Sequence, residues 1–172
     1  IESDDKLQLL SRVGNQNKHL LQTSAVLRDP SSWYHILVAV DTTNGTANDR
    51  GKIYINGVES PLAARTNPDQ NYDGHINAAV LHDIGKSTDT TYDGYLAEYN
   101  FIDGLALGPS SFGETGDYGE WKPIRYGGAY GNEGFYLDFK SSGVGTASSS
   151  TVGADRSGND NHWTSNNITA TD

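Results

Sequence analysis

The sequence predicts an all-β domain, a sandwich or jelly roll of antiparallel strands with minimal helix. Asn56-Gly57 separates two β-prone runs, and this dipeptide is the strongest short-range signal of a tight hairpin. Other short apolar runs are joined by loops rich in Gly, Asn, Asp, Ser and Thr, which are turn formers. Apolar residues make up only 35% of the 172 residues, which is typical of a β-rich domain with long polar loops. We therefore expect many short strands joined by turns.

The first part of the chain contains the clearest strands. Residues 6–13 fit both a helical and a strand period, but the turn that follows at Gly14-Asn15 favours a strand. Residues 18–27 would be the second strand of that hairpin. Residues 33–40 are a continuous β-branched and aromatic run, which predicts a buried interior strand.

Two further strands and one helical turn are expected in the second half. Residues 94–104 alternate, with Tyr95, Tyr99 and Phe101 on one face, so we predict a strand there. Residues 105–114 predict a helical turn, because their proline is tolerated in a first turn. Residues 135–139 predict another strand.

Composition excludes several classes of protein. The formal charge of −10 disfavours nucleic-acid binding, because an acidic surface repels phosphate. The chain has no Cys for disulfides or zinc clusters, and no apolar run long enough to span a membrane. It also has no Met and begins with Ile1. We therefore expect a single domain over residues 1–172, as a fragment of a longer polypeptide.

Several stretches carry a family resemblance. Residues 33–59 combine a Trp-aromatic-His-aliphatic strand, a polar loop and a short strand that ends in Asn-Gly, and residues 84–114 follow with a Gly-ended segment and an Asp-Gly strand. This pattern resembles the laminin-G-like, concanavalin A-like jelly rolls. Residues 112–139 and 153–168 are similar to the branch of that family found in phage and other viral structural proteins. The resemblance covers roughly residues 18–170.

The resemblance implies two antiparallel sheets in a curved sandwich, within a larger and often oligomeric virion protein such as a tail fibre, spike or decoration protein. Members of the wider fold bind glycans, often with calcium. A virion or extracellular location, a cell-surface glycan and other virion subunits, including copies of this chain, are therefore the expected setting. Residues 155–163 resemble a segment that lies near the start of many such domains. Residues 155–172 therefore either close this sandwich or begin a further domain.

Catalytic residues are not expected. Related retaining glycan hydrolases hold two carboxylates on one strand, which predicts a Glu-x-Asp-x-x-Glu signature, and the sequence lacks it. Glu98 and Asp103 fall on opposite faces of an extended strand, and the carboxylates of residues 114–120 lie in a Gly-rich loop. No serine elbow is present, and the five His residues lack metal-binding spacing. We expect that the protein is not an enzyme.

Aromatic residues in the loop 115–134 are the candidate ligand-binding residues. Sugars stack their apolar faces on exposed rings beside a few polar groups, as in other small-molecule pockets. The alternative is that these rings seal the sandwich edge or a subunit interface. Trp33 and Trp163 are expected in the core or at a sheet edge. The candidate rings are Tyr118, Trp121, Tyr126 and Tyr130.

A cluster of oxygen-bearing side chains near the C-terminus is a candidate metal site. Carboxylate and amide oxygens are the ligands that Ca²⁺ prefers, whereas Asx turns are the alternative explanation of the same composition. No cofactor is required, and Ca²⁺ is the candidate ion. The residues of this cluster are Asp155, Asn159, Asp160 and Asn161.

These observations together predict a non-enzymatic structural or adhesion module of a virion that binds a host-surface glycan. One alternative is a purely structural assembly or decoration domain without a ligand. A glycan hydrolase of the same fold is a less favoured alternative.

Overall fold

The computed structural model describes residues 4–86 and 91–169, and these residues are almost entirely strands, turns and loops. They contain no α-helix, and all strand pairs are antiparallel. The all-β prediction is confirmed. Ser87, which is part of the stretch 84–114 that carries the family resemblance, lies outside the described residues. Both ends of the predicted domain 1–172 also lie outside them.

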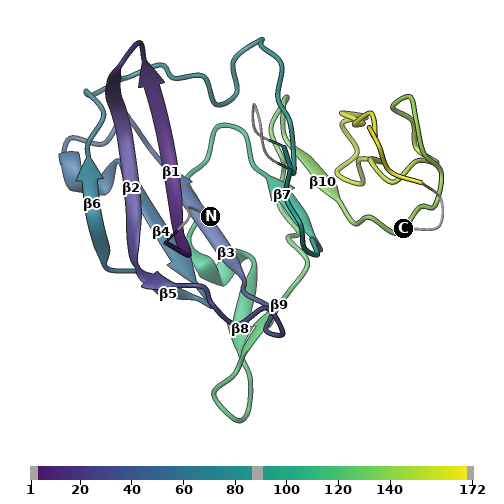
Figure 1. Ribbon diagram of the computed structural model, residues 1–172, viewed down its shortest axis with the longest axis horizontal. Helices are drawn as coiled ribbons and strands as arrows, with labels where there is room; N and C mark the ends of the chain where they lie inside the picture. Colours follow the sequence, from purple (N-terminus) through teal and green to yellow (C-terminus); the bar gives the residue numbers. More distant parts are fainter. Residues whose placement is uncertain (1–3, 87–90, 170–172) are drawn as a thin grey trace. The chain divides into compact units, whose positions relative to one another are not determined.

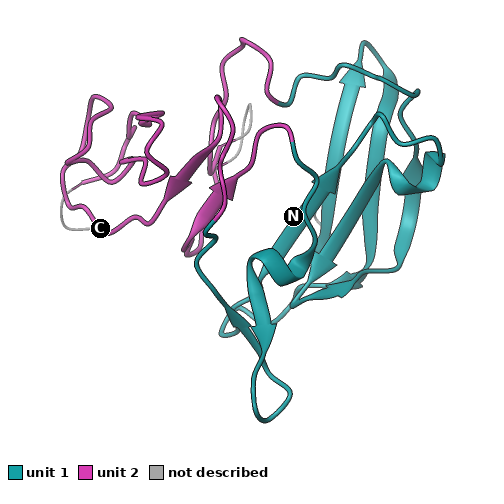
Figure 2. Cartoon of the chain, turned by 180° about the vertical axis from the view of Figure 1, so that it is seen from behind, with its two compact units in different colours: residues 1–76, 105–127 teal, residues 77–104, 128–172 magenta. Residues whose placement is uncertain are grey.

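Two compact units make up the chain (Figure 2). Unit 1 comprises residues 1–76 and 105–127, and unit 2 comprises residues 77–104 and 128–172. The chain therefore passes from unit 1 to unit 2, returns once to unit 1, and ends in unit 2. A single domain over residues 1–172 stays a prediction.

Unit 1 contains two three-stranded sheets and a small hairpin (Figure 1). One sheet has the order β1-β2-β6, the other has the order β3-β4-β5, and β8 pairs with β9. Two short 3-10 helices, η1 and η2, lie in the connections. The bounds are β1 Lys6–Val13, β2 Gln16–Val26, β3 Ile36–Val40, η1 Ala47–Asp49, β4 Gly51–Ile55, β5 Val58–Glu59, β6 Leu62–Thr66, η2 Pro109–Ser111, β8 Gly113–Thr115 and β9 Trp121–Pro123.

The two sheets of unit 1 face each other as a sandwich. Leu21 of β2 and Ile53 of β4 are almost fully buried, with exposures of 0% and 1%. Each such burial contributes about 1.5–3 kcal/mol. The strands approach closely at Gly51, where a Cβ atom would lie 2.4 Å from Nε2 of His19 and 3.0 Å from Leu21. A glycine at this position therefore permits the close approach of the sheets.

The two predicted tight turns are confirmed. Gly14-Asn15 joins β1 to β2, with Val13 paired to Gln16. Asn56-Gly57 joins β4 to β5, and both residues have positive φ angles, 49° and 81°. These are the angles that a type I′ turn requires. The predicted helical turn after residue 105 is also present, as η2.

Two strand predictions need correction. β3 begins only at Ile36 and bonds to β4 alone, so it is an edge strand of its sheet, not the predicted interior strand. The predicted strand 94–104 is reduced to three residues, β7 (Tyr99–Phe101). Glu98 has a φ of 56°, which no extended strand can contain, and this ends the alternation that the sequence suggested.

Unit 2 is built around β7 and its antiparallel partner β10 (Phe135–Leu137). The Phe135 ring stacks on Tyr99 at 5.8 Å and on Phe101 at 5.4 Å, and the Trp163 ring lies 5.0 Å away. Residues 155–163 pack against β10 through the Arg156 N–H, which donates to the Tyr136 carbonyl at 2.8 Å. The C-terminal segment thus returns to the strand pair of its own unit.

Candidate functional site

An open pocket of about 530 Å³ lies in unit 1, where three segments of the chain meet. This volume is within the range of about 300–1,000 Å³ that is usual for small-molecule sites. Trp33 comes from the segment before β3, and residues 56–58 form the turn between β4 and β5. Thr115 and residues 119–121 come from the β8–β9 hairpin, at the lower end of unit 1 in Figure 1.

Asn56 fixes one side of the pocket. Its N–H donates to the carbonyl of His35 at 2.8 Å, and its Oδ1 accepts the N–H of His35 at 2.8 Å. These two bonds attach the β4–β5 turn to the segment that carries Trp33. Because Oδ1 is used in this way, the Nδ2 group of Asn56 is left to donate to a ligand or to water.

The indole of Trp121 lies against two glycines. A Cβ atom on Gly57 would lie 2.4 Å from the ring, and one on Gly113 would lie 2.3 Å from it. The imidazole of His35 lies 5.7 Å away, tilted by 51°. Trp121 is consequently a partly buried and firmly held ring, and its Nε1 donor is buried without a hydrogen-bond partner.

The tip of the β8–β9 hairpin positions a carboxylate beside the indole. Oε2 of Glu120 accepts the N–H of Tyr118 at 3.0 Å, and Oε1 lies 3.0 Å from Nζ of Lys122. The hydrogen bond from Lys122, together with backbone N–H groups, lowers the pKa of Glu120. The pocket therefore carries a negative charge at neutral pH.

The four candidate rings lie in different environments and differ in exposure. Trp121 lines the pocket, and Tyr118 lies at the hairpin tip and is 96% exposed. Tyr126 packs on Phe112 at 5.2 Å within unit 1. Tyr130 is buried in unit 2, where its hydroxyl donates to Oδ1 of Asn100 at 2.9 Å. Tyr130 therefore has no ring face to offer to a ligand.

Sequence reasoning missed Trp33, which was expected in the core or at a sheet edge. The structure leaves 65% of this residue exposed, at the rim of the pocket. The missed signal is Asp29, whose carboxylate accepts the N–H of Ser31 at 2.9 Å and the hydroxyl of Ser32 at 2.6 Å. This turn extends the loop up to Trp33 and delays the start of β3. Trp163, by contrast, packs on Phe135.

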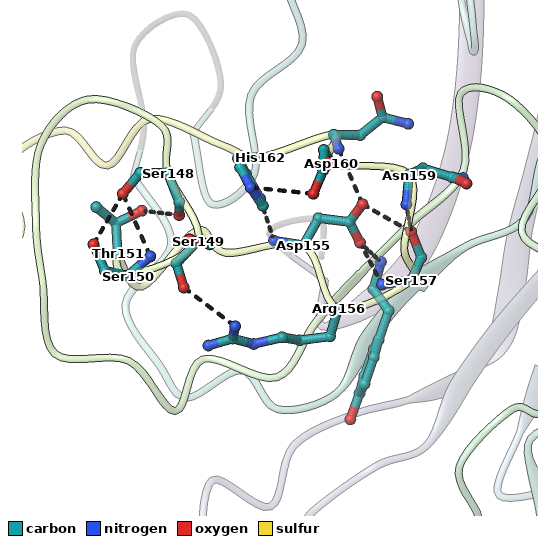
Figure 3. A network of polar contacts seen from close by, with 12 residues as sticks. Ser148, Ser149, Ser150, Thr151, Asp155, Arg156, Ser157, Asn159, Asp160 and His162 are labelled. Carbon is teal, nitrogen blue, oxygen red and sulfur yellow. Dashed lines mark hydrogen bonds and ion pairs between the residues drawn. The ribbon is translucent and has the colours of Figure 1, made fainter.

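The predicted metal cluster forms a hydrogen-bond network in unit 2 (Figure 3). Asp155 is buried, and its Oδ1 accepts the N–H groups of Tyr136 and Ser157, both at 2.8 Å. Its Oδ2 accepts the Ser157 hydroxyl at 2.7 Å and the Asn161 N–H at 3.0 Å. Burial raises the pKa of Asp155, but these hydrogen bonds outweigh burial, and the pKa is lowered overall.

The neighbouring Asn side chains also hold loops together through hydrogen bonds to backbone carbonyls. Nδ2 of Asn159 donates to the carbonyls of Gly131 and Gly134, at 2.6 and 2.9 Å. Nδ2 of Asn161 also donates to Gly134, at 3.0 Å. Oδ1 of Asp160 lies 3.7 Å from Nε2 of His162 (Figure 3). In the described part of the chain, no group of three or more acidic, His or Cys side chains could hold a metal ion.

Two of the carboxylates weighed for catalysis, Glu98 and Asp103, are held by structural contacts. Glu98 accepts the hydroxyl of Tyr136 at 2.5 Å. Asp103 accepts hydrogen bonds from the Asn77 amide at 2.7 Å and from the N–H of Asn132 at 3.1 Å.

None of the helices in the described residues is long and apolar enough to cross a membrane.

The described strands thus define an antiparallel β-sandwich protein with an open pocket lined by two tryptophans. A laminin-G-type family model, described as the concanavalin A-like lectin/glucanases superfamily, matches residues 1–111, which is more than half of the chain. The chain belongs to this superfamily. No curated protein and no solved structure matches it. The matched region includes Trp33 and the β4–β5 turn but ends before the β8–β9 hairpin.

Proposed function

We propose that the protein is a non-enzymatic carbohydrate-binding module, with its site in the pocket between Trp33 and Trp121. The observation that carries this proposal is the exposed Trp33 ring beside a rigidly held second indole in one open pocket. An apolar platform with a few polar groups is the usual construction of a small-molecule site. The superfamily to which the chain belongs includes lectins.

The chemistry of the pocket suits a pyranose ring. The C–H face of the sugar would cover Trp33, whose exposed indole needs little rearrangement to accept it. The Asn56 amide would donate to a hydroxyl, and the Glu120 carboxylate would accept one. Trp121 would form the pre-formed wall of the site, since its contacts with glycine fix its orientation.

The biological setting that we propose is a virion protein that attaches to a host-surface glycan. The support for it is the resemblance of residues 112–139 and 153–168 to viral structural proteins. A site with one or two stacking rings binds weakly, so adhesion would require several copies of the chain. An oligomeric fibre or spike supplies these through effective concentration.

A purely structural module is the second candidate, and one observation favours it. Unit 2 exposes large apolar side chains, with Leu81 at 88% and Tyr95 at 83% exposure. Large exposed apolar side chains mark a surface that contacts another protein when they form a contiguous patch. In this case the exposed side chains of unit 2 would contact other virion subunits and no glycan would be needed.

Glycan hydrolysis is less favoured because it requires two carboxylates across the scissile bond. Glu120 is the only carboxylate among the described residues that line the pocket. The absence of catalysis is tested by incubating the protein with a panel of bacterial polysaccharides and assaying for new reducing ends. Release that Glu120→Gln abolishes would contradict our proposal.

A glycan array with the protein displayed multivalently tests the proposed site. We expect Trp33→Ala to abolish the signal while the melting temperature stays the same, because Trp33 is exposed. Tyr95→Ala is the matched control, since Tyr95 is an exposed aromatic residue of unit 2. Equal signals from the parent and Trp33→Ala would exclude the pocket as the binding site.

A further inference from the structure

We propose that Glu120 makes this pocket selective for neutral glycans and against glycans with a carboxylate on the bound sugar. The inference rests on the proposed function and adds the class of ligand. It depends on the charge of the pocket lining, which is independent of the aromatic stacking that supports binding itself.

The carboxylate of Glu120 is held in place at the pocket. One oxygen accepts the Tyr118 N–H and the other is paired with Lys122, so both are held by residues of the same hairpin. The side chain is nevertheless 43% exposed. A carboxylate has about four acceptor positions, so lone pairs remain for sugar hydroxyls.

The described residues of the pocket lining offer no positive charge to an acidic ligand. Among the described residues that line the pocket, Glu120 is the only charged one. Lys122 is outside the lining, and its ammonium group is already paired with Glu120. An acidic sugar would have to break this pair in order to recruit the lysine.

The surrounding charges act in the same direction. The β8–β9 hairpin carries three acidic residues, at positions 114, 117 and 120, against the single basic residue Lys122. Glu59 follows Val58, a residue of the pocket lining, although Lys52 lies 3.7 Å from the Glu59 carboxylate. The whole chain has a charge of −10. An anionic ligand therefore meets repulsion at the lining, on the hairpin and in the field of the protein.

A neutral sugar, in contrast, finds complementary hydrogen-bonding groups. Asn56 offers its Nδ2 donor because its Oδ1 is bound to His35. Glu120 offers acceptors. A hydroxyl group can both donate and accept, whereas a sugar carboxylate can only accept. Replacing a sugar hydroxymethyl group near Glu120 by a carboxylate thus exchanges a hydrogen bond for repulsion.

Matched pairs of oligosaccharides that end in a neutral hexopyranose or in the corresponding hexuronic acid test this inference. We expect the parent, displayed multivalently, to bind the neutral member roughly fivefold more tightly at low ionic strength. The preference should shrink as salt rises from about 20 to 500 mM, because exposed charges are screened within about 10 Å or less. Glu120→Gln should bring the ratio of the two affinities close to one, whatever it does to the affinity for the neutral member.

Glu114→Gln is the matched control, because it removes a carboxylate from the same hairpin but not from the pocket lining. It should retain most of the preference. Binding of both members without discrimination, or an unchanged preference in Glu120→Gln, would overturn this inference and leave the proposed function in place. Failure of the parent to bind any pair would overturn both.

Discussion

Trp121 and Gly57 are distant in sequence, yet a Cβ atom on Gly57 would lie only 2.4 Å from the indole of Trp121. The same glycine has a φ of 81° in the β4–β5 turn. One residue thus meets two requirements, a left-handed turn conformation and the absence of a side chain. The candidate pocket depends on this contact, because it brings the β8–β9 hairpin against the turn.

Gly57→Ala should therefore destabilise unit 1 through both requirements. The left-handed conformation costs a non-glycine residue about 1–2 kcal/mol, and overpacking against the indole costs about 1–3 kcal/mol. We expect a loss of roughly 2–5 kcal/mol in urea-induced unfolding. Gly45→Ala is the control, because it has open space around it and no positive φ. A change below about 0.5 kcal/mol at Gly57 would show that the contact is not formed.

The local features of the fold were predictable from the sequence. Asn56-Gly57 and Gly14-Asn15 predict tight turns, because Asn and Gly readily adopt the positive φ angles that such turns require. The left-handed conformation of Glu98 was not predictable, since alternating aromatic residues on both sides of it suggest a continuous strand. No pattern in the local sequence reports that Glu98 accepts a hydrogen bond from Tyr136.

The candidate site was predictable only in part. Trp121 was identified because large rings in a Gly-rich loop must be covered by something. Its partners were not, because its contacts with Gly57 and His35 join segments far apart in the chain. Tyr130 has the same local composition as Trp121 and is buried in unit 2. Composition therefore cannot separate a binding ring from a packing ring.

The two pocket tryptophans should differ in their effect on stability. Trp121→Ala should cost roughly 3 kcal/mol, because it removes a held ring from between two glycines. Trp33→Ala should change the free energy of unfolding by less than about 0.5 kcal/mol, since 65% of the residue is exposed. Denaturant titration of both variants measures this difference. A large loss from Trp33→Ala would show that Trp33 supports the fold.

Stability should also fall in mild acid because of His19. This side chain is 3% exposed between the sheets of unit 1, and its Nε2 has no hydrogen-bond partner. Burial, followed by the charge of Arg65, lowers the pKa of His19 below its usual 6.5. Below pH 6.5 the unfolded chain takes up a proton that the folded chain resists. The free energy of unfolding therefore decreases as the pH falls from 6.5 toward the lowered pKa.

The decrease attributable to His19 can reach at most about 1.4 kcal/mol per pH unit, the limit for one proton. His19→Leu should remove this contribution and flatten the profile between pH 7 and pH 5, measured by urea titration at each pH. His82→Gln is the control, because His82 is exposed. His35, whose pKa burial also lowers, contributes a slope of the same sign that should remain in His19→Leu. Parallel profiles for the parent and His19→Leu would contradict the prediction.

Asp155 should stabilise unit 2 through its hydrogen bonds and not act as a calcium ligand. Its carboxylate accepts four hydrogen bonds, from Tyr136, Ser157 and Asn161. Asp155→Asn replaces an acceptor by an amide donor that faces these donors, so we expect a loss of roughly 2–4 kcal/mol. Asp160→Asn is the control, because the Asp160 side chain is 89% exposed, and it should change stability little.

Adding calcium tests the alternative, that the Asp155 network binds Ca²⁺. A hundredfold excess of Ca²⁺ over its dissociation constant would stabilise a binding site by about 2.7 kcal/mol. For a chain of this size, such stabilisation raises the melting temperature by about 5–10 °C. We expect equal melting temperatures in excess calcium and in chelator, because both oxygens of Asp155 are occupied and the amides of Asn159 and Asn161 present donors to backbone carbonyls. A rise of this size that Asp155→Asn removes would show that the network rearranges into a cation site.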